Sequence, residues 1–383
     1  MLRIHKLFAI HPRVELREFY FFSIFFSFAS SLILIFEPIF FYKEGVGLYR
    51  IALYYALHYF FYVLMLPLGG KFMSRFGLER SLTLAMPLFV TYFLVLAAMP
   101  IFPALFWVAW ILLTIFKIFY WPAYHTVLAR YGDGDNRGTE LSWLIALTEG
   151  IGVLGPMLGG IVATVFGFPI LFIMAALVAL AAGWPLLKTK ERFQRQRFAY
   201  LAPWRLMRER AFRGTLLTMV GWSENLIDLV FWPIFMFMIV GSVDRLGFLA
   251  SLNILLMTMI GFFVGEVSDR FSRQRILRLH VPFMVLGYLF RPLAGSALRV
   301  LLTDALSRTA LIGVRIPQYY RLYVKAKHLG GLRYVVAFEM VLALAKGTTA
   351  LALVAAFSLL TPYAAFSLAF GLAAAFSLLY LFL

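Results

Sequence analysis

The sequence predicts an all-α membrane protein of twelve transmembrane helices, arranged as two similar six-helix bundles. Hydrophobic residues make up 63% of the 383 residues and charged residues only 14%, whereas soluble domains have roughly 45–50% and 25%. The apolar residues occur in blocks of about the 20 residues that a helix needs to cross a bilayer. Together with a mean hydropathy of +0.87, these blocks indicate a helical membrane protein.

Short polar turns separate the predicted helices. The spans are 19–41, 47–70, 81–99, 102–129, 141–165, 169–187, 214–240, 246–266, 278–295, 298–321, 333–358 and 362–382. The first 18 residues have no signal-peptide cleavage pattern, so we expect the first helix to be retained. Strands that alternate apolar and polar residues, as in a membrane barrel, are not evident in the sequence.

Three features recur 195 residues apart and indicate a duplication. They are Phe36-Glu37-Pro38-Ile39-Phe40 with Phe231-Trp232-Pro233-Ile234-Phe235, the set Gly70, Arg75, Phe76 and Arg80 with Gly265, Arg270, Phe271 and Arg275, and Pro122 with Pro317. The repeat contains six helices, an even number, so both copies keep one orientation. Parallel repeats with the substrate site between them are a transporter architecture. We therefore predict bundles at 1–187 and 214–383, joined by a basic linker at 188–213.

The net charge of +17 is unevenly distributed. Most Lys and Arg lie in the turns that one topology places on a single side, which by the positive-inside rule puts both termini in the cytoplasm of a plasma (inner) membrane. No polar segment is long enough to form a folded nucleic-acid-binding domain, so we expect no nucleic-acid partner. The basic linker is expected to contact anionic lipids. The chain has no cysteine, which excludes disulfides and thiolate chemistry.

The loop at 265–275 carries a glycine followed four residues later by Asp-Arg and further basic residues. It resembles the signature loop of the major facilitator superfamily (MFS), a family of secondary transporters, and 70–77 is a weaker copy with Ser74 in place of Asp. Such a loop would act as a latch that forms in one conformation and breaks in another. The predicted latch residues are Gly70, Arg75, Gly77, Gly265, Asp269, Arg270 and Arg273.

Glycines also recur in the predicted helix at 141–165. The set Gly150, Gly155, Pro156, Gly159 and Gly160 resembles the GPxxGG motif of the superfamily's exporters and antiporters. Glycines at this spacing allow close helix packing. Export and generic packing are therefore both open interpretations.

Ionisable residues inside the spans are the third signal, because a charge at the bilayer centre costs roughly 2.5–3.5 kcal/mol and usually faces a partner or water. The family resemblance implies that the first, fourth, seventh and tenth helices line a central cavity. The cavity residues expected there are Glu37, Lys117, Tyr120, Trp121, Glu224, Asp228, Trp232, Asp304, Arg308 and Arg315.

Spacing suggests how these residues group. Glu224, Asp228 and Trp232 share one helical stripe, and Asp304, Arg308 and Arg315 share another. Asp304 and Arg308 could pair within one turn, whereas Asp228 and Arg308 are predicted to form a functional couple between helices. Lys117 is interpreted as a partner of Glu37 or as a contact for an anionic group of the substrate.

Other ionisable residues have structural interpretations. Glu339 and Lys346 share a face of a helix outside the predicted cavity, and His58 and His125 are interpreted as hydrogen-bonded rather than proton-carrying. The histidines have no metal-binding spacing, so we expect neither metal nor cofactor.

We therefore expect a monomeric secondary transporter of a small solute that works by alternating access, not an enzyme. Burial favours the neutral form of a carboxyl group, so a proton is the simplest coupling ion. The motifs favour an exporter or antiporter of amphipathic compounds. The alternatives are a lipid or lysolipid translocator, an importer of sugars or carboxylates, a polytopic membrane enzyme, and a non-transporting receptor.

Overall fold

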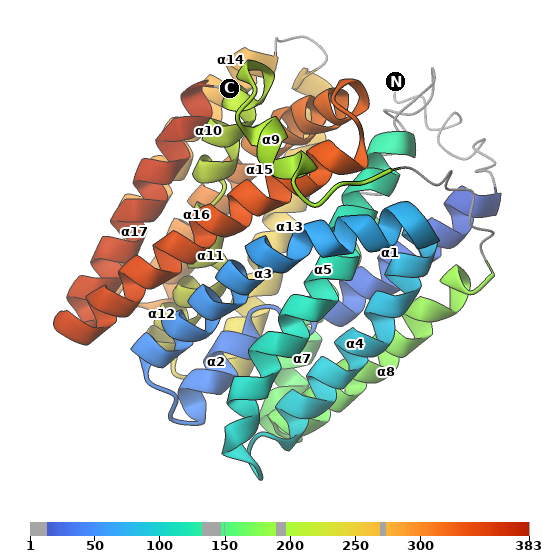
Figure 1. Ribbon diagram of the computed structural model, residues 1–383. Coiled ribbons are helices and arrows are strands. Elements are labelled where there is room, and N and C mark those ends of the chain that lie inside the picture. Colours follow the sequence, from blue (N-terminus) through green and yellow to red (C-terminus); the bar gives the residue numbers. More distant parts are fainter. Residues whose placement is uncertain (1–13, 132–146, 149, 189–196, 269–272, 383) are drawn as a thin grey trace, which may run out of the picture.

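In the computed structural model, every regular element of the described residues is a helix (Figure 1). The structure describes residues 14–131, 147–148, 150–188, 197–268 and 273–382, and within these ranges it contains no strand. The all-α membrane fold predicted from the sequence is confirmed.

Among the described residues, the first part of the chain contains seven α-helices. They are α1 (Val14–Ser31), α2 (Phe36–Lys43), α3 (Leu48–Phe76), α4 (Leu78–Ala98), α5 (Phe106–Tyr131), α7 (Leu154–Val165) and α8 (Phe168–Leu186). The helix predicted at 19–41 is divided between α1 and α2, because the backbone turns at 32–35. The two pieces together remain one candidate span, Glu18–Lys43.

The linker contains the short helix α9 (Ala202–Met207), and the second part of the chain follows it. Its elements are α10 (Arg213–Gly221), α11 (Glu224–Leu226), the π-helical η4 (Ile227–Phe231), α12 (Trp232–Val240), α13 (Val243–Ser268), α14 (Arg273–Phe290), η5 (Arg291–Leu293), α15 (Ala297–His328), α16 (Leu332–Leu359), α17 (Pro362–Leu378) and η6 (Leu379–Phe382). The predicted seventh helix therefore consists of α10, α11, η4 and α12.

Ten of the described helices are long and apolar enough to cross a membrane, and the helix at Gly150–Val165 is shorter but apolar. The helix α15 is 32 residues long and is absent from the ten because it carries several charges. Three of these charged residues, Asp304, Arg308 and Arg315, form ion pairs inside the protein. With α15 and the Gly150–Val165 helix, the described spans match the twelve predicted from the sequence.

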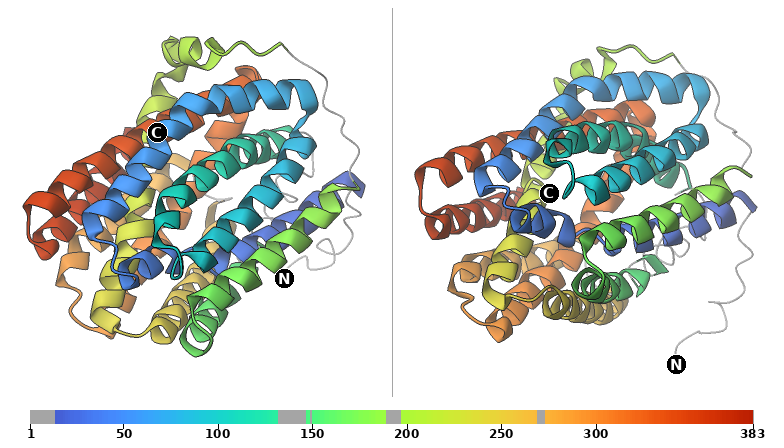
Figure 2. Two further views of the ribbon diagram at one scale, coloured as in Figure 1. Left: turned by 60° about the horizontal axis from the view of Figure 1, so that its bottom comes forward. Right: turned by 90° about the horizontal axis from the view of Figure 1, so that it is seen from below.

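The neighbour pattern of the first six spans recurs in the last six. The helix α4 packs on α5 and α8, and in the same way α14 packs on α15 and α17. Between the two groups, α3 packs along α16 and α7 along α13 (Figure 2). We call the surface formed by these two helix pairs the seam.

Two ends of the molecule are useful reference points. The linker end is the end at which α9 lies, and the far end holds α2 and the 44–47 turn (Figure 1). At the linker end, Gly70 is buried, and a Cβ on it would lie 2.5 Å from the Phe198 ring. The turn between α3 and α4 is a single glycine, Gly77, whose φ of 110° favours glycine.

The predicted latch falls partly outside the described residues. Asp269 and Arg270 lie outside them, and the side chains around Gly265 and Arg273 are not described. Arg75 is exposed at the end of α3, where it stacks on Phe76 with its guanidinium carbon 5.2 Å from the ring centroid. The latch stays a prediction.

The glycines of α7 make close helix contacts on both of its sides. A Cβ on Gly155 would overlap Ser31, and one on Gly159 would overlap the carbonyl oxygen of Leu32, next to the break between α1 and α2. A Cβ on Gly160 would lie 2.9 Å from the Val243 carbonyl oxygen at the start of α13. Close packing thus accounts for the glycine spacing in this helix. Gly150, by contrast, has nothing within 4 Å of the corresponding position.

Candidate functional site

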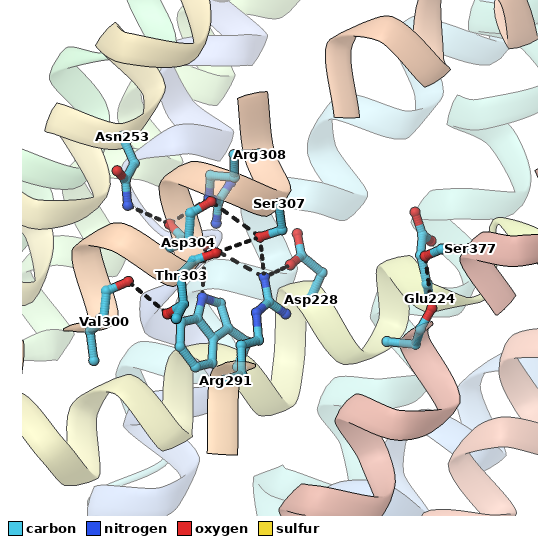
Figure 3. Close-up of polar contacts among 12 residues, drawn as sticks. Glu224, Asp228, Asn253, Arg291, Val300, Thr303, Asp304, Ser307, Arg308 and Ser377 are labelled. Carbon is cyan, nitrogen blue, oxygen red and sulfur yellow. Dashed lines mark hydrogen bonds and ion pairs between the residues drawn. The ribbon is translucent and has the colours of Figure 1, made fainter. Parts of the chain in front are cut away.

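Arg291 is the centre of a charged network inside the second bundle (Figure 3). Its side chain is fully buried, and its Nη2 lies 2.5 Å from Oδ1 of Asp228 and 3.6 Å from Oδ1 of Asp304. The same nitrogen donates to Oγ of Ser307 at 3.1 Å. Two anions and two cations, Asp228, Asp304, Arg291 and Arg308, make up this four-residue network.

Both carboxylate oxygens of Asp304 accept hydrogen bonds. Its Oδ2 accepts hydrogen bonds from Nε of Arg308 at 2.8 Å and from Nδ2 of Asn253 at 2.7 Å, and its Oδ1 accepts one from Nε1 of Trp232 at 2.8 Å. The guanidinium carbon of Arg291 lies 4.3 Å from the centroid of the Trp232 ring and 4.4 Å from that of Tyr288. These two rings contact a guanidinium whose Nε and Nη1 have no hydrogen-bond partner among the described residues.

The four-residue network lies within one bundle. Its members come from η4, η5 and α15, and the donors to Asp304 come from α12 and α13. Because the charges balance and three of the four carboxylate oxygens accept hydrogen bonds, the arrangement is suited to holding these helices together.

The pairing differs from the sequence-based hypothesis. Among the described residues, Asp228 contacts Arg291 directly, whereas Arg308 contacts Asp304 within its own helix. The predicted Asp304–Arg308 pair is confirmed. Arg308 lies within electrostatic reach of Asp228 but forms no direct ion pair with it.

Glu224 belongs to a second cluster, apart from the first (Figure 3). Its Oε1 is 3.0 Å from Nη2 of Arg315 and accepts the Tyr380 hydroxyl at 3.2 Å. The Arg315 guanidinium carbon lies 4.4 Å from the centroid of the Trp222 ring. Glu224 and Asp228 therefore do not act as one stripe: η4 is π-helical, so its residues do not follow the α-helical repeat on which the predicted stripe depends.

A third cluster crosses the seam at Glu339 of α16. Its Oε2 accepts the hydroxyl of Tyr62 from α3 at 3.2 Å, and its Oε1 lies 3.4 Å from Nε2 of His125 from α5. The other ring nitrogen of His125 is 3.0 Å from the hydroxyl of Tyr323 on α15. All of these side chains except Tyr323 are buried. Four helices, two from each bundle, meet at these side chains.

Two lysines approach one tyrosine beside that cluster. Nζ of Lys117 on α5 lies 5.5 Å from the centroid of the Tyr59 ring, and Nζ of Lys346 on α16 lies 5.6 Å from it. Lys346 also donates to Oδ1 of Asn225 at 2.9 Å. Lys117 is half-buried and Lys346 is buried.

The remaining predicted cavity residues lie in the first bundle. Glu37 is half-buried and accepts the Tyr55 hydroxyl at 2.7 Å. Tyr120 stacks on Phe26, with their ring centroids 4.2 Å apart, and so belongs to the aromatic packing between α1 and α5. The Trp121 ring stacks on His125, with centroids 5.4 Å apart, next to the seam.

Sequence reasoning did not place Glu339, Lys346 or Arg291 in the site. Their charge inside an apolar span is a visible signal, but which helix each charge faces depends on how the bundles pack. Glu339 and Lys346 lie on α16, which packs along α3 of the other bundle. No group of three or more His, Asp or Glu that could hold a metal ion occurs among the described residues.

Comparison with known proteins identifies one family. The model of the Major Facilitator Superfamily matches residues 19–316, which cover most of the chain from the first span into α15. A search of curated proteins finds no match to the sequence.

Proposed function

Because the chain belongs to the Major Facilitator Superfamily, it is a secondary transporter of that superfamily, and we propose that it couples solute movement to protons through Glu339 at the seam. The observation that carries this proposal is the contact of one carboxylate with both bundles. Glu339 of α16 accepts a hydrogen bond from Tyr62 of α3 and lies beside His125 of α5.

A proton on Glu339 changes the contacts across the seam. The ionised carboxylate accepts the Tyr62 hydroxyl in a charge-assisted bond, which is roughly twice as strong as a neutral one. It also attracts the cations of Lys117 and Lys346, which lie within electrostatic reach. Protonation removes this charge, so the contact between α16 and the first bundle weakens. Proton binding at this residue therefore biases the two bundles toward separation at this point.

Alternating access needs contacts that open at one end while the other end stays closed. Near the linker end the bundles meet through His125 and Tyr323. At the far end, Tyr42 of α2 contacts Phe237 of α12, with ring centroids 6.5 Å apart, and Gly160 contacts the start of α13. The cycle we propose breaks these two sets of contacts in turn. By the positive-inside rule the linker end faces the cytoplasm of a plasma membrane, with both termini on that side.

The export hypothesis rests on the glycines of α7. Their contacts with Leu32 and with the start of α13 account for the motif through packing, so the motif supports no particular direction of transport. The basic headgroup site of the lipid alternative would use Arg315 and Lys117, but Arg315 is already paired with Glu224. We propose a small solute as the cargo and a monomer as the working unit.

The test compares two transport modes in liposomes that contain the purified protein. Exchange of labelled for unlabelled solute needs no net proton movement, whereas uphill accumulation driven by a pH gradient does. We expect Glu339→Gln to keep exchange and lose accumulation. The matched control, Glu44→Gln at an exposed far-end position, keeps both. Undiminished accumulation by Glu339→Gln would refute the coupling role.

A further inference from the structure

Two lysine ammonium groups meet at the Tyr59 ring without a carboxylate of the described residues in direct contact with either of them. Lys117 and Lys346 come from different bundles, and both ammonium groups lie within 6 Å of the same ring centroid, at 5.5 and 5.6 Å. Among the described residues neither lysine has a carboxylate oxygen within 4 Å. A buried charge without a direct counter-ion is costly, so this arrangement favours a bound anion.

The nearby carboxylates are engaged with other partners. Glu37 accepts the Tyr55 hydroxyl, Glu224 is paired with Arg315, and Glu339 accepts the Tyr62 hydroxyl. They lie within electrostatic reach of one or both lysines but outside direct contact. Both lysines can therefore still form a direct ion pair with a bound anion.

Unpartnered polar atoms occur in the same neighbourhood. Nε2 of His58 is buried and has no hydrogen-bond partner among the described residues, and His58 lies within electrostatic reach of both lysines. Oε2 of Glu224, close enough to Lys346 to interact electrostatically, is also buried and unpartnered. Buried polar groups are normally bonded. Both atoms are acceptors, because a carboxylate carries no donor and because His58 Nδ1 donates to Thr114, whose hydroxyl donates to the Trp110 carbonyl oxygen. They therefore favour a solute that carries N–H or O–H donors in addition to its anionic group.

We propose that Lys117 and Lys346 form an anion-binding subsite on Tyr59 for a solute that carries a carboxylate or phosphate group. Lysine binds both groups as a point charge, and the Tyr59 ring brings the two ammonium groups together. Because each bundle supplies one lysine, the bound anion bridges the seam. This inference deepens the proposed transport function by naming the class of cargo, but binding can be measured without transport.

An anion at this position also explains why a proton would travel with it. The six ionisable residues Glu37, Lys117, Glu224, Arg315, Glu339 and Lys346 balance in charge when all are ionised. Adding an anion leaves one excess negative charge in a region of low dielectric, which favours a proton on a neighbouring carboxylate. Glu339 contacts both bundles and is the carboxylate best placed to take it. Solute and proton would then move in the same direction.

The test measures the thermal stability and the Kd of the purified full-length protein with four small probes and one lipid. Benzoate and phenyl phosphate carry the anionic groups, benzamide is the neutral counterpart of benzoate, and benzylammonium is the cationic one. Lysophosphatidic acid presents the phosphate on a lipid. We expect the anionic probes to raise the Tm and the neutral and cationic probes to leave it unchanged. A larger shift with lysophosphatidic acid than with phenyl phosphate would support the subsite and identify a lipid as the source of the anion.

Variants locate the binding. Lys117→Met and Lys346→Met should each weaken the binding of the best anionic probe about tenfold to a hundredfold, as expected for one hydrogen bond to a charged group. Lys188→Met, at an exposed position at the end of α8, should bind as the unaltered protein does. If Lys117→Met and Lys346→Met both fail to fold, the comparison of benzoate with benzamide on the unaltered protein still tests the subsite.

Two results would overturn the subsite: equal effects of benzoate and benzamide, or unchanged binding in folded Lys117→Met and Lys346→Met proteins. Anion binding that depends on the lysines, in a protein whose transport is independent of protons, would keep the subsite and refute the coupling through Glu339.

Discussion

Removing Arg291 is the sharpest perturbation of the second bundle. This residue is fully buried, contacts Asp228 at 2.5 Å and packs against the rings of Trp232 and Tyr288. Replacing it with methionine keeps an apolar side chain in the space but leaves Asp228 without its direct cation. Breaking a buried ion pair by deleting one partner costs about 3–5 kcal/mol. We expect Arg291→Met to lower the free energy of unfolding by that amount.

A second variant separates charge from packing. Adding Asp228→Asn to Arg291→Met removes the stranded carboxylate, because replacing both partners of a buried pair is far less costly than deleting one. We expect the double variant to recover at least half of the lost stability. The single variant Asp228→Asn completes the double-mutant cycle that measures the coupling between the two residues. Arg299→Met, at an exposed position on α15, should stay within about 0.5 kcal/mol of the unaltered protein.

Equilibrium unfolding in mixed micelles with increasing sodium dodecyl sulfate, followed by tryptophan fluorescence, supplies these free energies. A loss below about 1 kcal/mol for Arg291→Met, or a double variant no more stable than the single one, would refute the reasoning that the four-residue network holds this bundle together.

Two further predictions use the same unfolding assay. Gly159→Ala should strongly lower the free energy of unfolding, because its new Cβ would overlap the carbonyl oxygen of Leu32. Gly371→Ala, whose Cβ would have nothing within 4 Å, should raise the free energy of unfolding by up to about 1 kcal/mol through helix propensity. Equal effects of the two substitutions would contradict the close packing of α7. Trp232→Phe keeps a ring beside Arg291 but loses the 2.8 Å bond to Asp304, so we expect a loss of about 1.5–3 kcal/mol, and an unchanged stability would show that this bond contributes little.

The fold was predictable because bilayer thickness sets the length of each helix and the duplication sets their order. The interruption of the first helix at 32–35 has a signal in the sequence, because Pro38 cannot donate to the carbonyl of Leu34 and its ring crowds that carbonyl. The contact of Leu32 with Gly159, on a helix more than one hundred residues later in the sequence, depends on tertiary packing. The pairing of Asp304 with Arg308 was predictable because both residues lie on one helix turn.

The partners of most other charged side chains depend on packing between helices. Arg291 lies at the predicted end of a span, and nothing in its local sequence indicates that it folds over Asp228 in the interior. The π-helical η4 separates Glu224 from Asp228 although α-helical spacing groups them. Glu339 lies on a helix that the family resemblance places outside the cavity, yet α16 packs along α3 and brings this carboxylate to Tyr62.

The absence of cysteine from the whole sequence allows spin labels to be placed at chosen pairs of positions. Leu187→Cys with His328→Cys reports the separation of the bundles at the linker end, and Ile101→Cys with Leu359→Cys reports it at the far end; all four positions are exposed.

The most direct test measures the distance between the two spin labels in each labelled protein by pulsed electron paramagnetic resonance. Each distance is recorded with Glu339 intact and with Glu339→Gln, which mimics the protonated carboxyl group. The comparison shows whether this carboxylate controls opening of the seam at one end at a time. We predict that Glu339→Gln lengthens the linker-end distance while the far-end distance is unchanged or shorter. Identical distance distributions in the two backgrounds, or lengthening at both ends together, would contradict the proposed cycle.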